Sequence, residues 1–175
     1  ERLSKMVEEL LDMSRLQNGS MKLSVVQTDL LAEFEETVFM MSERAKSEQI
    51  TIEYVPEEDA ISALVDKDRV KQVFFNVIDN AIKHSHPQGR IEIAARVMED
   101  YALFIVQDYG EGISEEDLPH IKDMFYKGSS QKRGSGIGLG VSDEIMRLHG
   151  GTLEIESTLN VGTVVTIRFP VESAD

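Results

Sequence analysis

A run in the middle of the chain places two asparagines, a lysine and a histidine at helical spacing. In this run, Asn76-Val-Ile-Asp-Asn80-Ala-Ile-Lys83-His84, the four residues fall on one helix face beside an apolar stripe. A carboxamide can offer its oxygen to a hard cation such as Mg²⁺, and a lysine one turn further can meet a phosphate as a point charge. A polar face turned to solvent would explain the same pattern, so this segment alone leaves both interpretations open.

A carboxylate and two glycines come directly after a predicted strand, in Asp108-Tyr-Gly110-Glu-Gly112-Ile113. Glycines at a strand end let the flat face of a ligand approach the backbone closely. The carboxylate can accept a hydrogen bond from an exocyclic amine. An ordinary acidic turn is the alternative interpretation of this segment.

A glycine-rich run opens a predicted helix and suits an anion, because its backbone N–H groups lie at the positive helix end. Its sequence is Gly134-Ser135-Gly136-Ile137-Gly138-Leu139-Gly140. Three cations stand just before it in a strongly acidic chain: Lys127, Lys132 and Arg133. That contrast suggests a movable lid closing over phosphates. A further pair, Gly162-Thr163, lies between the last two predicted strands and could reach the same pocket, although alone it is an ordinary turn.

Spacing excludes several other motifs. No Gly-Lys-Ser/Thr occurs, so the glycine run is not a P-loop, and the third glycine of a dinucleotide fingerprint would fall on Val141. The His-Arg-Asp and Asp-Phe-Gly signatures of protein kinases are absent. Asp66-Lys-Asp68 lacks the acidic and glycine positions of a calcium loop, and the four histidines lack partners at metal-ligand spacing.

The composition excludes further classes of function. The chain has 175 residues and a formal net charge of -14, so phosphate backbones and anionic membranes would be repelled. It has no cysteine, which excludes disulfides, thiolate metal sites and a cysteine nucleophile. No apolar run approaches the roughly 18 residues that span a bilayer. Any anionic ligand must therefore be held by a local arrangement.

Apolar periodicity and turn residues predict the elements that position these segments. Helices are expected to Leu16 with a stop at Asn18-Gly19, from Thr28 as N-cap to Ala45, from Asp66 or Asp68 to about His84, and over 137–148. Strands are expected at 50–54, 63–65, 91–97, 101–107, 152–157 and 162–169. Residues 20–27 form an extended link, and Ser114–Asp117 resembles a capping box that starts a short helix.

The order of these elements favours one architecture. Strands come mostly as antiparallel neighbours, and helices are inserted between pairs of strands rather than after each strand. We therefore expect a two-layer α/β sandwich, with a mixed, mostly antiparallel sheet covered on one face by helices, over a doubly wound parallel sheet.

Taken in chain order, the segments resemble the ATP-binding catalytic domain of bacterial sensor histidine kinases over roughly residues 28–170. The runs 76–84, 108–113 and 134–140 resemble that family's asparagine box and its two glycine boxes, and Phe125-Tyr126-Lys127 resembles the phenylalanine box of its lid. The resemblance implies the Bergerat ATP-binding fold of the GHKL superfamily, which gyrase, heat-shock ATPases and mismatch-repair ATPases share. It also implies two cofactors, ATP and Mg²⁺.

Residue roles follow from the same resemblance. Asp108 would accept the adenine amine, Asn80 with Asn76 would coordinate Mg²⁺, Lys83 and Lys127 would neutralise phosphate charge, and His84 would sit beside the nucleotide. Amides near Gly136 to Leu139 would cradle the phosphates. The other residues expected at the nucleotide are Gly110, Gly112, Ile113, Tyr126, Gly134, Ser135, Gly138 and Thr163; Asn76, Asn80 and Lys83 are the expected catalytic residues.

The chain also departs from the family pattern. Lys122 stands where the lid's first phenylalanine belongs, Gly140 replaces the usual alanine, and Asn160 replaces a glycine. Gyrase-like relatives have an acidic residue at the place of Asn76, and an amide cannot accept a proton from water, which favours transfer to another group over hydrolysis. No phosphoacceptor segment of the His-Glu-x-x-Arg/Asn-x-Pro kind is present, so we expect no autophosphorylation by this chain alone.

The resemblance divides the chain and predicts partners. Residues 1–19 would end a dimerisation and histidine-phosphotransfer helix, 20–27 would be a linker, and 28–175 the catalytic domain of a longer protein. We expect the histidine-phosphotransfer domain of the same parent protein and a response-regulator receiver domain as partners, a homodimeric parent and no nucleic acid. The domain would be cytoplasmic, with membrane anchorage of the parent left open. The alternatives are a GHKL-type ATPase, an anti-sigma-factor-like serine kinase, or a degenerate interaction module.

Overall fold

A computed structural model describes residues 2–126 and 137–171. The elements in these ranges are, in chain order, α1 (Arg2–Gln17), β1 (Val26–Asp29), α2 (Leu30–Ser47), β2 (Thr51–Tyr54), β3 (Ser62–Val65), α3 (Lys67–His84), β4 (Arg90–Met98), β5 (Tyr101–Asp108), the 3₁₀ helix η1 (Leu118–His120), α4 (Gly138–Leu148), β6 (Thr152–Thr158) and β7 (Gly162–Pro170). Among these helices, none is long and apolar enough to cross a bilayer.

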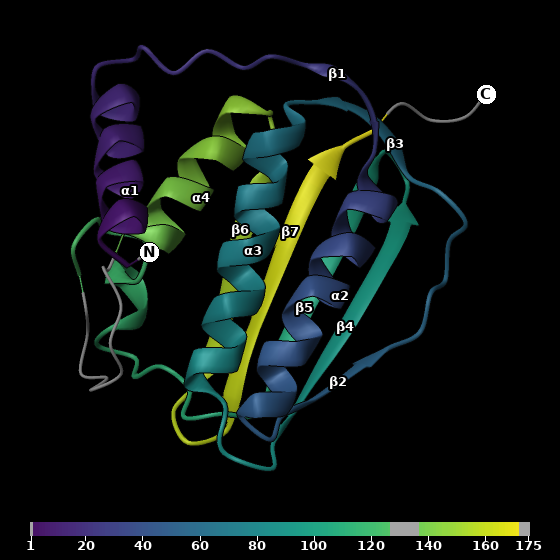
Figure 1. Cartoon of the computed structure of the whole chain (residues 1–175), viewed down its shortest axis with the longest axis vertical. Helices are drawn as coiled ribbons and strands as arrows, with labels where there is room; N and C mark the ends of the chain where they lie inside the picture. The colour runs from purple at the N-terminus through teal and green to yellow at the C-terminus, as the bar shows by residue number, and fades with distance from the viewer. Residues whose placement is uncertain (1, 127–136, 172–175) are drawn as a thin grey trace.

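Five strands form the main sheet, in the order β2-β4-β5-β7-β6. Only β2 and β4 run parallel, and the other neighbours are antiparallel. Helices α2, α3 and α4 lie together on one face of this sheet (Figure 1). The predicted two-layer sandwich with a mixed, mostly antiparallel sheet is therefore confirmed, and the doubly wound alternative is wrong.

A second, two-stranded sheet joins β1 to β3 in antiparallel register, with Val26 opposite Val65. The strand predicted at 63–65 thus pairs outside the main sheet. The prediction of Thr28 as N-cap of the second helix is wrong. Asp29 is the cap, and its Oδ1 accepts hydrogen bonds from Leu31 N at 3.1 Å and Ala32 N at 3.4 Å. Thr28 Oγ1 instead donates to the Val26 carbonyl at 3.0 Å, so it does not reach the helix start.

A side-chain cap also decides the start of α3, and a serine closes the turn before η1. Of the two aspartates proposed for α3, Asp66 is the cap, and its Oδ1 accepts from Arg69 N at 3.2 Å. Ser114 Oγ accepts from Asp117 N at 3.1 Å, as in a capping box. The short helix that follows is the single 3₁₀ turn η1, which itself has no side-chain cap.

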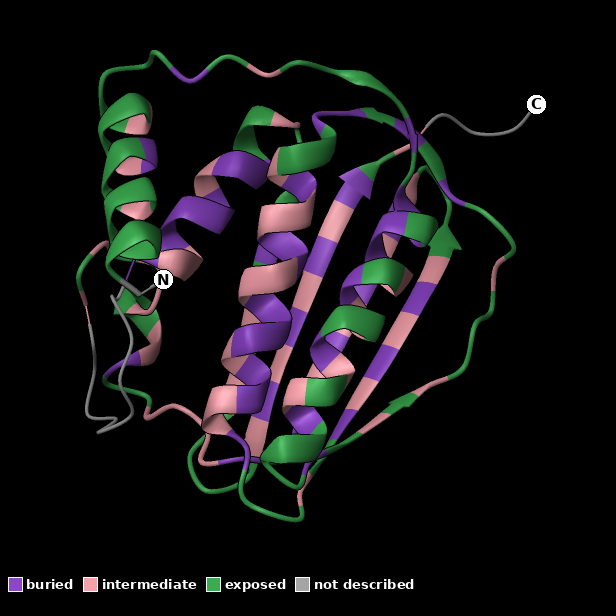
Figure 2. Ribbon diagram, in the orientation of Figure 1, coloured by how far each residue is buried: buried purple, intermediate pink, exposed green. Residues whose placement is uncertain are grey.

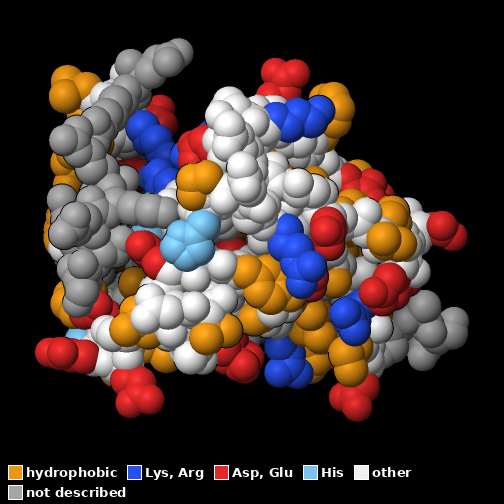
Figure 3. Space-filling view, turned by 90° about the horizontal axis from the view of Figure 1, so that it is seen from below, with side chains coloured by type: hydrophobic (Ala, Val, Ile, Leu, Met, Phe, Trp, Pro, Cys, Tyr) orange, Lys and Arg blue, Asp and Glu red, His pale blue; other side chains and the backbone are white. Residues whose placement is uncertain are grey.

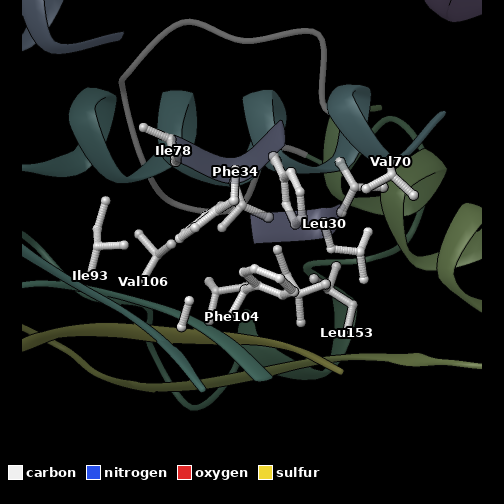
Figure 4. Close-up of a cluster of buried hydrophobic side chains, with 14 of the residues drawn as sticks. Leu30, Phe34, Val70, Ile78, Ile93, Phe104, Val106 and Leu153 are labelled. Atoms are coloured by element: carbon white, nitrogen blue, oxygen red, sulfur yellow. The ribbon is translucent and has the colours of Figure 1, made fainter. Parts of the chain in front are cut away.

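Four phenylalanines form the centre of the core between the helices and the sheet. Phe34, Phe74, Phe104 and Phe169 are all fully buried. The ring of Phe34 lies 4.8 Å from that of Phe104 and 4.9 Å from that of Phe74, centroid to centroid. Figure 4 shows Phe34 reaching from the helical layer toward Phe104 on the sheet. Along β5 and β7 buried residues alternate with partly exposed ones (Figure 2), as expected for a sheet with one covered face.

An ion-pair cluster joins α2 to α3 above this core. Lys67 Nζ lies 3.0 Å from Glu33 Oε1, and Lys71 Nζ lies 3.1 Å from Glu33 Oε2. Burial works to raise the pKa of Glu33, but the hydrogen bonds from Lys67 and Lys71 outweigh it and hold this pKa below its usual range. The charged form of Glu33 is therefore favoured in the folded protein.

Replacing Glu33 by glutamine should lower the free energy of unfolding at neutral pH. We expect a loss of about 0.5–1 kcal/mol, because both lysines are partly exposed and water screens the pairs. Since the pKa is lower in the folded state, this contribution is complete well above the unfolded pKa of about 4.3 and is lost as the pH falls through the folded pKa. Urea unfolding at pH 7 and near pH 3 measures the difference, with Glu43→Gln on the exposed side of α2 as control. A difference that stays constant with pH would contradict the assignment.

Candidate functional site

Three chain segments that are distant in sequence meet at one end of the molecule. The last residues of α3, the end of β5 and the turn from β6 to β7 all lie at the lower end in Figure 1. Asp108 is directly opposite Thr163 in the β5–β7 register. The asparagine box, the first glycine box and the terminal Gly-Thr are thus brought to the same end of the sheet. Figure 3 views this end and shows a histidine near its centre, with acidic and basic side chains around it.

Asp108 is a buried carboxylate at the end of β5, and only 5% of the residue is exposed. Its Oδ1 accepts a hydrogen bond from Gly110 N at 3.0 Å. Burial raises the pKa of Asp108, and the backbone N–H groups of Gly110 and Thr163 and the charge of His84 partly oppose this rise. A fixed acceptor in a nearly dry setting can recognise a ligand amine with more energy than an exposed one.

Close backbone approach explains the two glycines that follow. A Cβ on Gly110 would lie 1.9 Å from the His84 carbonyl oxygen, which also accepts a hydrogen bond from Glu111 N at 3.1 Å. Gly112 has a φ of +66°, and a Cβ there would lie 2.0 Å from the Thr158 carbonyl oxygen. The glycine box is therefore packed between the end of α3 and the end of β6.

Ser157, which the sequence motifs did not indicate, joins the glycine box to the Gly-Thr pair. Its Oγ accepts from Ile113 N at 2.8 Å, donates to the Gly162 carbonyl at 2.9 Å and lies 2.7 Å from Thr163 Oγ1. A serine near the end of a strand has no pattern that would mark it in advance, since its partners come from two other segments.

The asparagine face of α3 meets the start of α4. Asn76 Nδ2 donates to the Gly138 carbonyl at 3.3 Å and to Ser142 Oγ at 3.2 Å. Asn80 lies one turn further along α3 and is half-buried. The N-cap residue of α4 is Ile137, whose apolar side chain cannot accept a hydrogen bond from the first turn of the helix. The second glycine box and the asparagine box are therefore adjacent through Gly138.

Lys83 and His84, two residues expected at the site, have protein partners in this structure. Lys83 Nζ lies 3.0 Å from Asp79 Oδ2, one helical turn before it. His84 Nδ1 contacts Glu111 Oε1, so the histidine is held at the first glycine box. These contacts place both side chains at the end of α3, on the same helix as Asn80.

The proposed lid is described only at its first residues. Tyr126 Oη donates to Asp117 Oδ1 at 2.6 Å, and this bond raises the pKa of Tyr126. Lys122, at the place of a family phenylalanine, pairs with Asp143 of α4 at 2.9 Å. The predicted site residues Lys127, Gly134, Ser135 and Gly136 lie outside the described ranges.

The structure thus sorts the predicted residues into two neighbouring groups. One gathers at the end of β5 and comprises Asp108, Gly110, Gly112, Ile113, Thr163 and, through Glu111, His84. The other gathers where α3 meets α4 and comprises Asn76, Ile137, Gly138 and Leu139, with Asn80 and Lys83 further along α3. Tyr126 is bound to Asp117 before the glycine run.

Comparisons with known proteins point to one family. The family model for histidine kinase-, DNA gyrase B- and HSP90-like ATPases matches residues 65–173. The sensor histidine kinase YvrG of Bacillus subtilis is 30% identical over 172 residues, which is 97% of this chain and 30% of that protein. The signal transduction histidine-protein kinase AfsQ2 of Streptomyces coelicolor is 31% identical over 173 residues, or 97% of this chain and 31% of that protein. The chain therefore spans less than a third of the length of these relatives.

Solved structures agree with the family model. The histidine kinase AdeS of Acinetobacter baumannii has a TM-score of 0.80 at 25% identity, covering 99% of this chain and 80% of that chain. The catalytic domain of histidine kinase ThkA has a TM-score of 0.74 at 24% identity, covering 85% and 96%, and shares the fold. The chain belongs to the histidine kinase-, DNA gyrase B- and HSP90-like ATPase family, and within it to the catalytic domains of histidine-kinase type.

Proposed function

We propose that this chain binds ATP with Mg²⁺ and transfers the γ-phosphoryl group to a histidine outside its 175 residues, as the catalytic domain of a sensor histidine kinase. The observation that supports this most is the pairing of buried Asp108 with Thr163 beside an asparagine face that contacts the start of α4. The two neighbouring groups together offer a carboxylate for a base, carboxamides for a cation and a helix start for phosphates.

The residues present fit the magnesium ion that this function needs. The hydrogen bonds of Asn76 to Gly138 and Ser142 use its amide nitrogen, which turns the nitrogen toward α4 and leaves the amide oxygen as the acceptor of that side chain. No group of three His, Cys, Asp or Glu side chains within 2–126 and 137–171 could hold a metal. Amide oxygens of Asn80 and Asn76, completed by phosphate oxygens, match the preference of Mg²⁺ for few protein ligands. Bound there, the ion would neutralise triphosphate charge.

The protein's part in the reaction is positioning and charge compensation. In the proposed complex Asp108 holds the adenine amine, the first N–H groups of α4 at Gly138 and Leu139 bind phosphate oxygens, and Lys83 turns toward the phosphates. The unprotonated nitrogen of the acceptor imidazole forms a bond to the γ-phosphorus while the bond to the bridging oxygen breaks and ADP leaves with that oxygen. The proton on the other ring nitrogen passes to solvent water. Asn76 cannot accept a proton from water, which supports transfer rather than hydrolysis.

Mixing this chain with the histidine-phosphotransfer domain of its parent protein and γ-labelled ATP tests the proposal. We expect label on the added domain that is stable to base and labile to acid, as a phosphohistidine is. Label on serine would support the anti-sigma-factor-like alternative, and release of phosphate without protein labelling would support a simple ATPase. This chain alone should remain unlabelled.

Two further partners follow from the same proposal. The solved complex of histidine kinase ThkA with response regulator protein TrrA supports a receiver domain as the next phosphoryl acceptor for the parent of this chain. Helix α1 leaves apolar side chains exposed, namely Leu3, Met6, Val7, Leu10 and Leu11. Figure 2 shows this outer side of α1 as exposed. We assign it to the dimerisation helix of a homodimeric parent and place the catalytic domain in the cytoplasm, where ATP is available.

A further inference from the structure

Asp79 is a buried carboxylate that the proposed function does not use, although it immediately precedes Asn80. Only 5% of the residue is exposed. Its Oδ2 lies 3.0 Å from Lys83 Nζ and 3.9 Å from Lys5 Nζ, and its Oδ1 contacts Arg44 Nη1. Cations from three helices, α1, α2 and α3, thus share one carboxylate.

Helix α1 contacts α3 at two points, and the two helices run in opposite directions. Near the start of α3, Asp12 lies 2.8 Å from Arg69 Nη1 and accepts a hydrogen bond from Gln72 Nε2 at 3.0 Å. Seven residues before Asp12, Lys5 Nζ lies 4.7 Å from the centre of the Phe75 ring. It also reaches Asp79, which lies seven residues after Gln72 on α3. Helix α1 lies beside α4 in Figure 1. Its docking therefore places Lys5 next to Asp79, within the run 76–84.

We propose that Asp79 is a positioning residue shared by Lys5 and Lys83, so that docking of α1 controls how readily Lys83 can leave Asp79 for the phosphates of ATP. This inference rests on the proposed function in assigning Lys83 to the phosphates. With α1 docked, Lys5 and Arg44 still balance the buried Asp79 when Lys83 turns away. With α1 detached, that movement leaves Asp79 with Arg44 alone, and a buried charge with too little compensation is costly.

The charges around Asp79 support this coupling. Burial, and next the positive charge of Lys83, lowers the pKa of Lys5, which indicates that the two ammonium groups repel each other. Phosphates that draw Lys83 away relieve this repulsion. By reciprocity, ATP should then strengthen the docking of α1 by the same factor as α1 strengthens the binding of ATP.

The test compares ATP with adenosine on the whole chain by calorimetry. Lys5→Ala should weaken ATP binding by about twofold to fivefold, the range of a screened ion pair, and leave adenosine binding unchanged because adenosine has no phosphates. Lys5→Arg should restore the affinity. Lys22→Ala, which removes the same charge from an exposed site in the linker, should change neither affinity.

A second variant and a second measurement distinguish coupling between α1 and ATP from a general loss of structure at the site. Asp12→Ala weakens docking at the far end of α1, keeps Lys5 and Asp79, and should also lower ATP affinity. Hydrogen exchange should show α1 amides better protected with ATP than with adenosine, and Asp79→Asn should abolish this difference. Equal weakening of ATP and adenosine, or unchanged ATP affinity after α1 detaches, would overturn the coupling. Failure of the unaltered chain to bind ATP would instead overturn the proposed function.

Discussion

Replacing Asp108 by alanine should weaken ATP binding by about tenfold to a hundredfold. A hydrogen bond to a charged group contributes about 1.5–3 kcal/mol, and each 1.4 kcal/mol corresponds to a factor of ten in affinity. Asp108 is buried, so water cannot replace the lost acceptor easily. Calorimetric titration with ATP measures the effect, and titration with GTP should show that the preference for adenine falls in parallel.

The substitution Asp108→Asn distinguishes the role of this side chain in adenine recognition from its role in holding the backbone of the following loop. Asp108→Asn keeps an oxygen that can accept from Gly110 N, now 3.0 Å from Asp108 Oδ1, but places an amide NH₂ where a second acceptor stood. We expect it to retain the fold and still lose adenine selectivity. Asp123→Ala, which removes an exposed carboxylate near the lid, is the matched control. Equal ATP affinity for Asp108→Ala and the unaltered chain would reject the adenine assignment.

The fold was predictable from the sequence where periodicity and local chemistry agree. The stripe of Val70, Val73, Phe74 and Val77 has a single helical solution, and these residues are fully buried in α3. The alternating apolar residues of β4 and β5 likewise predicted two consecutive strands, and the register shows them as antiparallel neighbours, as expected for this sheet. The confirmed architecture follows because antiparallel neighbours and helices on one face bury these stripes together.

The details that were missed depend on contacts between distant residues. Thr28 and Asp29 are both good caps in isolation, and Asp29 prevails because its Oδ1 also accepts from Ile61 N at 3.1 Å, across the small β1–β3 sheet. The sharing of Asp79 among three cations also depends on distant residues. Lys83 lies four residues after Asp79 on the same helix, whereas Arg44 and Lys5 reach the same carboxylate from other helices.

The candidate site was predictable in part: its segments could be recognised in the sequence, but most of the contacts between them could not. Each box was visible in the sequence because two asparagines four residues apart are unusual in the middle of a helix, and because glycines cluster directly after one strand and directly before one helix. That Asp108 faces Thr163 could be inferred only through the family resemblance, since the register of β5 on β7 is set by the whole sheet. Ser157 had no such signal, although it joins Ile113 to Thr163.

The second large effect is expected at Asn80. In the proposed function its amide oxygen is a ligand of Mg²⁺, which is the main counter-charge of the triphosphate. Alanine forms helices better than asparagine, so α3 should keep its stability and the loss should be confined to the site. Phosphotransfer to the added acceptor domain should fall by about a hundredfold to a thousandfold, as when a preorganised electrostatic group is removed elsewhere.

Metal dependence gives the decisive measurement for Asn80→Ala, because it does not require turnover. In the unaltered chain ATP affinity should rise as Mg²⁺ is added and fall when a chelator removes it. In Asn80→Ala this rise should disappear, while adenosine binding, which in the proposed function depends on Asp108, should be unchanged. The same substitution at Asn18, in the turn after α1, should leave both affinities and the metal dependence intact. If Asn80→Ala keeps the full response to Mg²⁺, Asn80 is not a ligand of the ion, and its assignment to the metal is wrong.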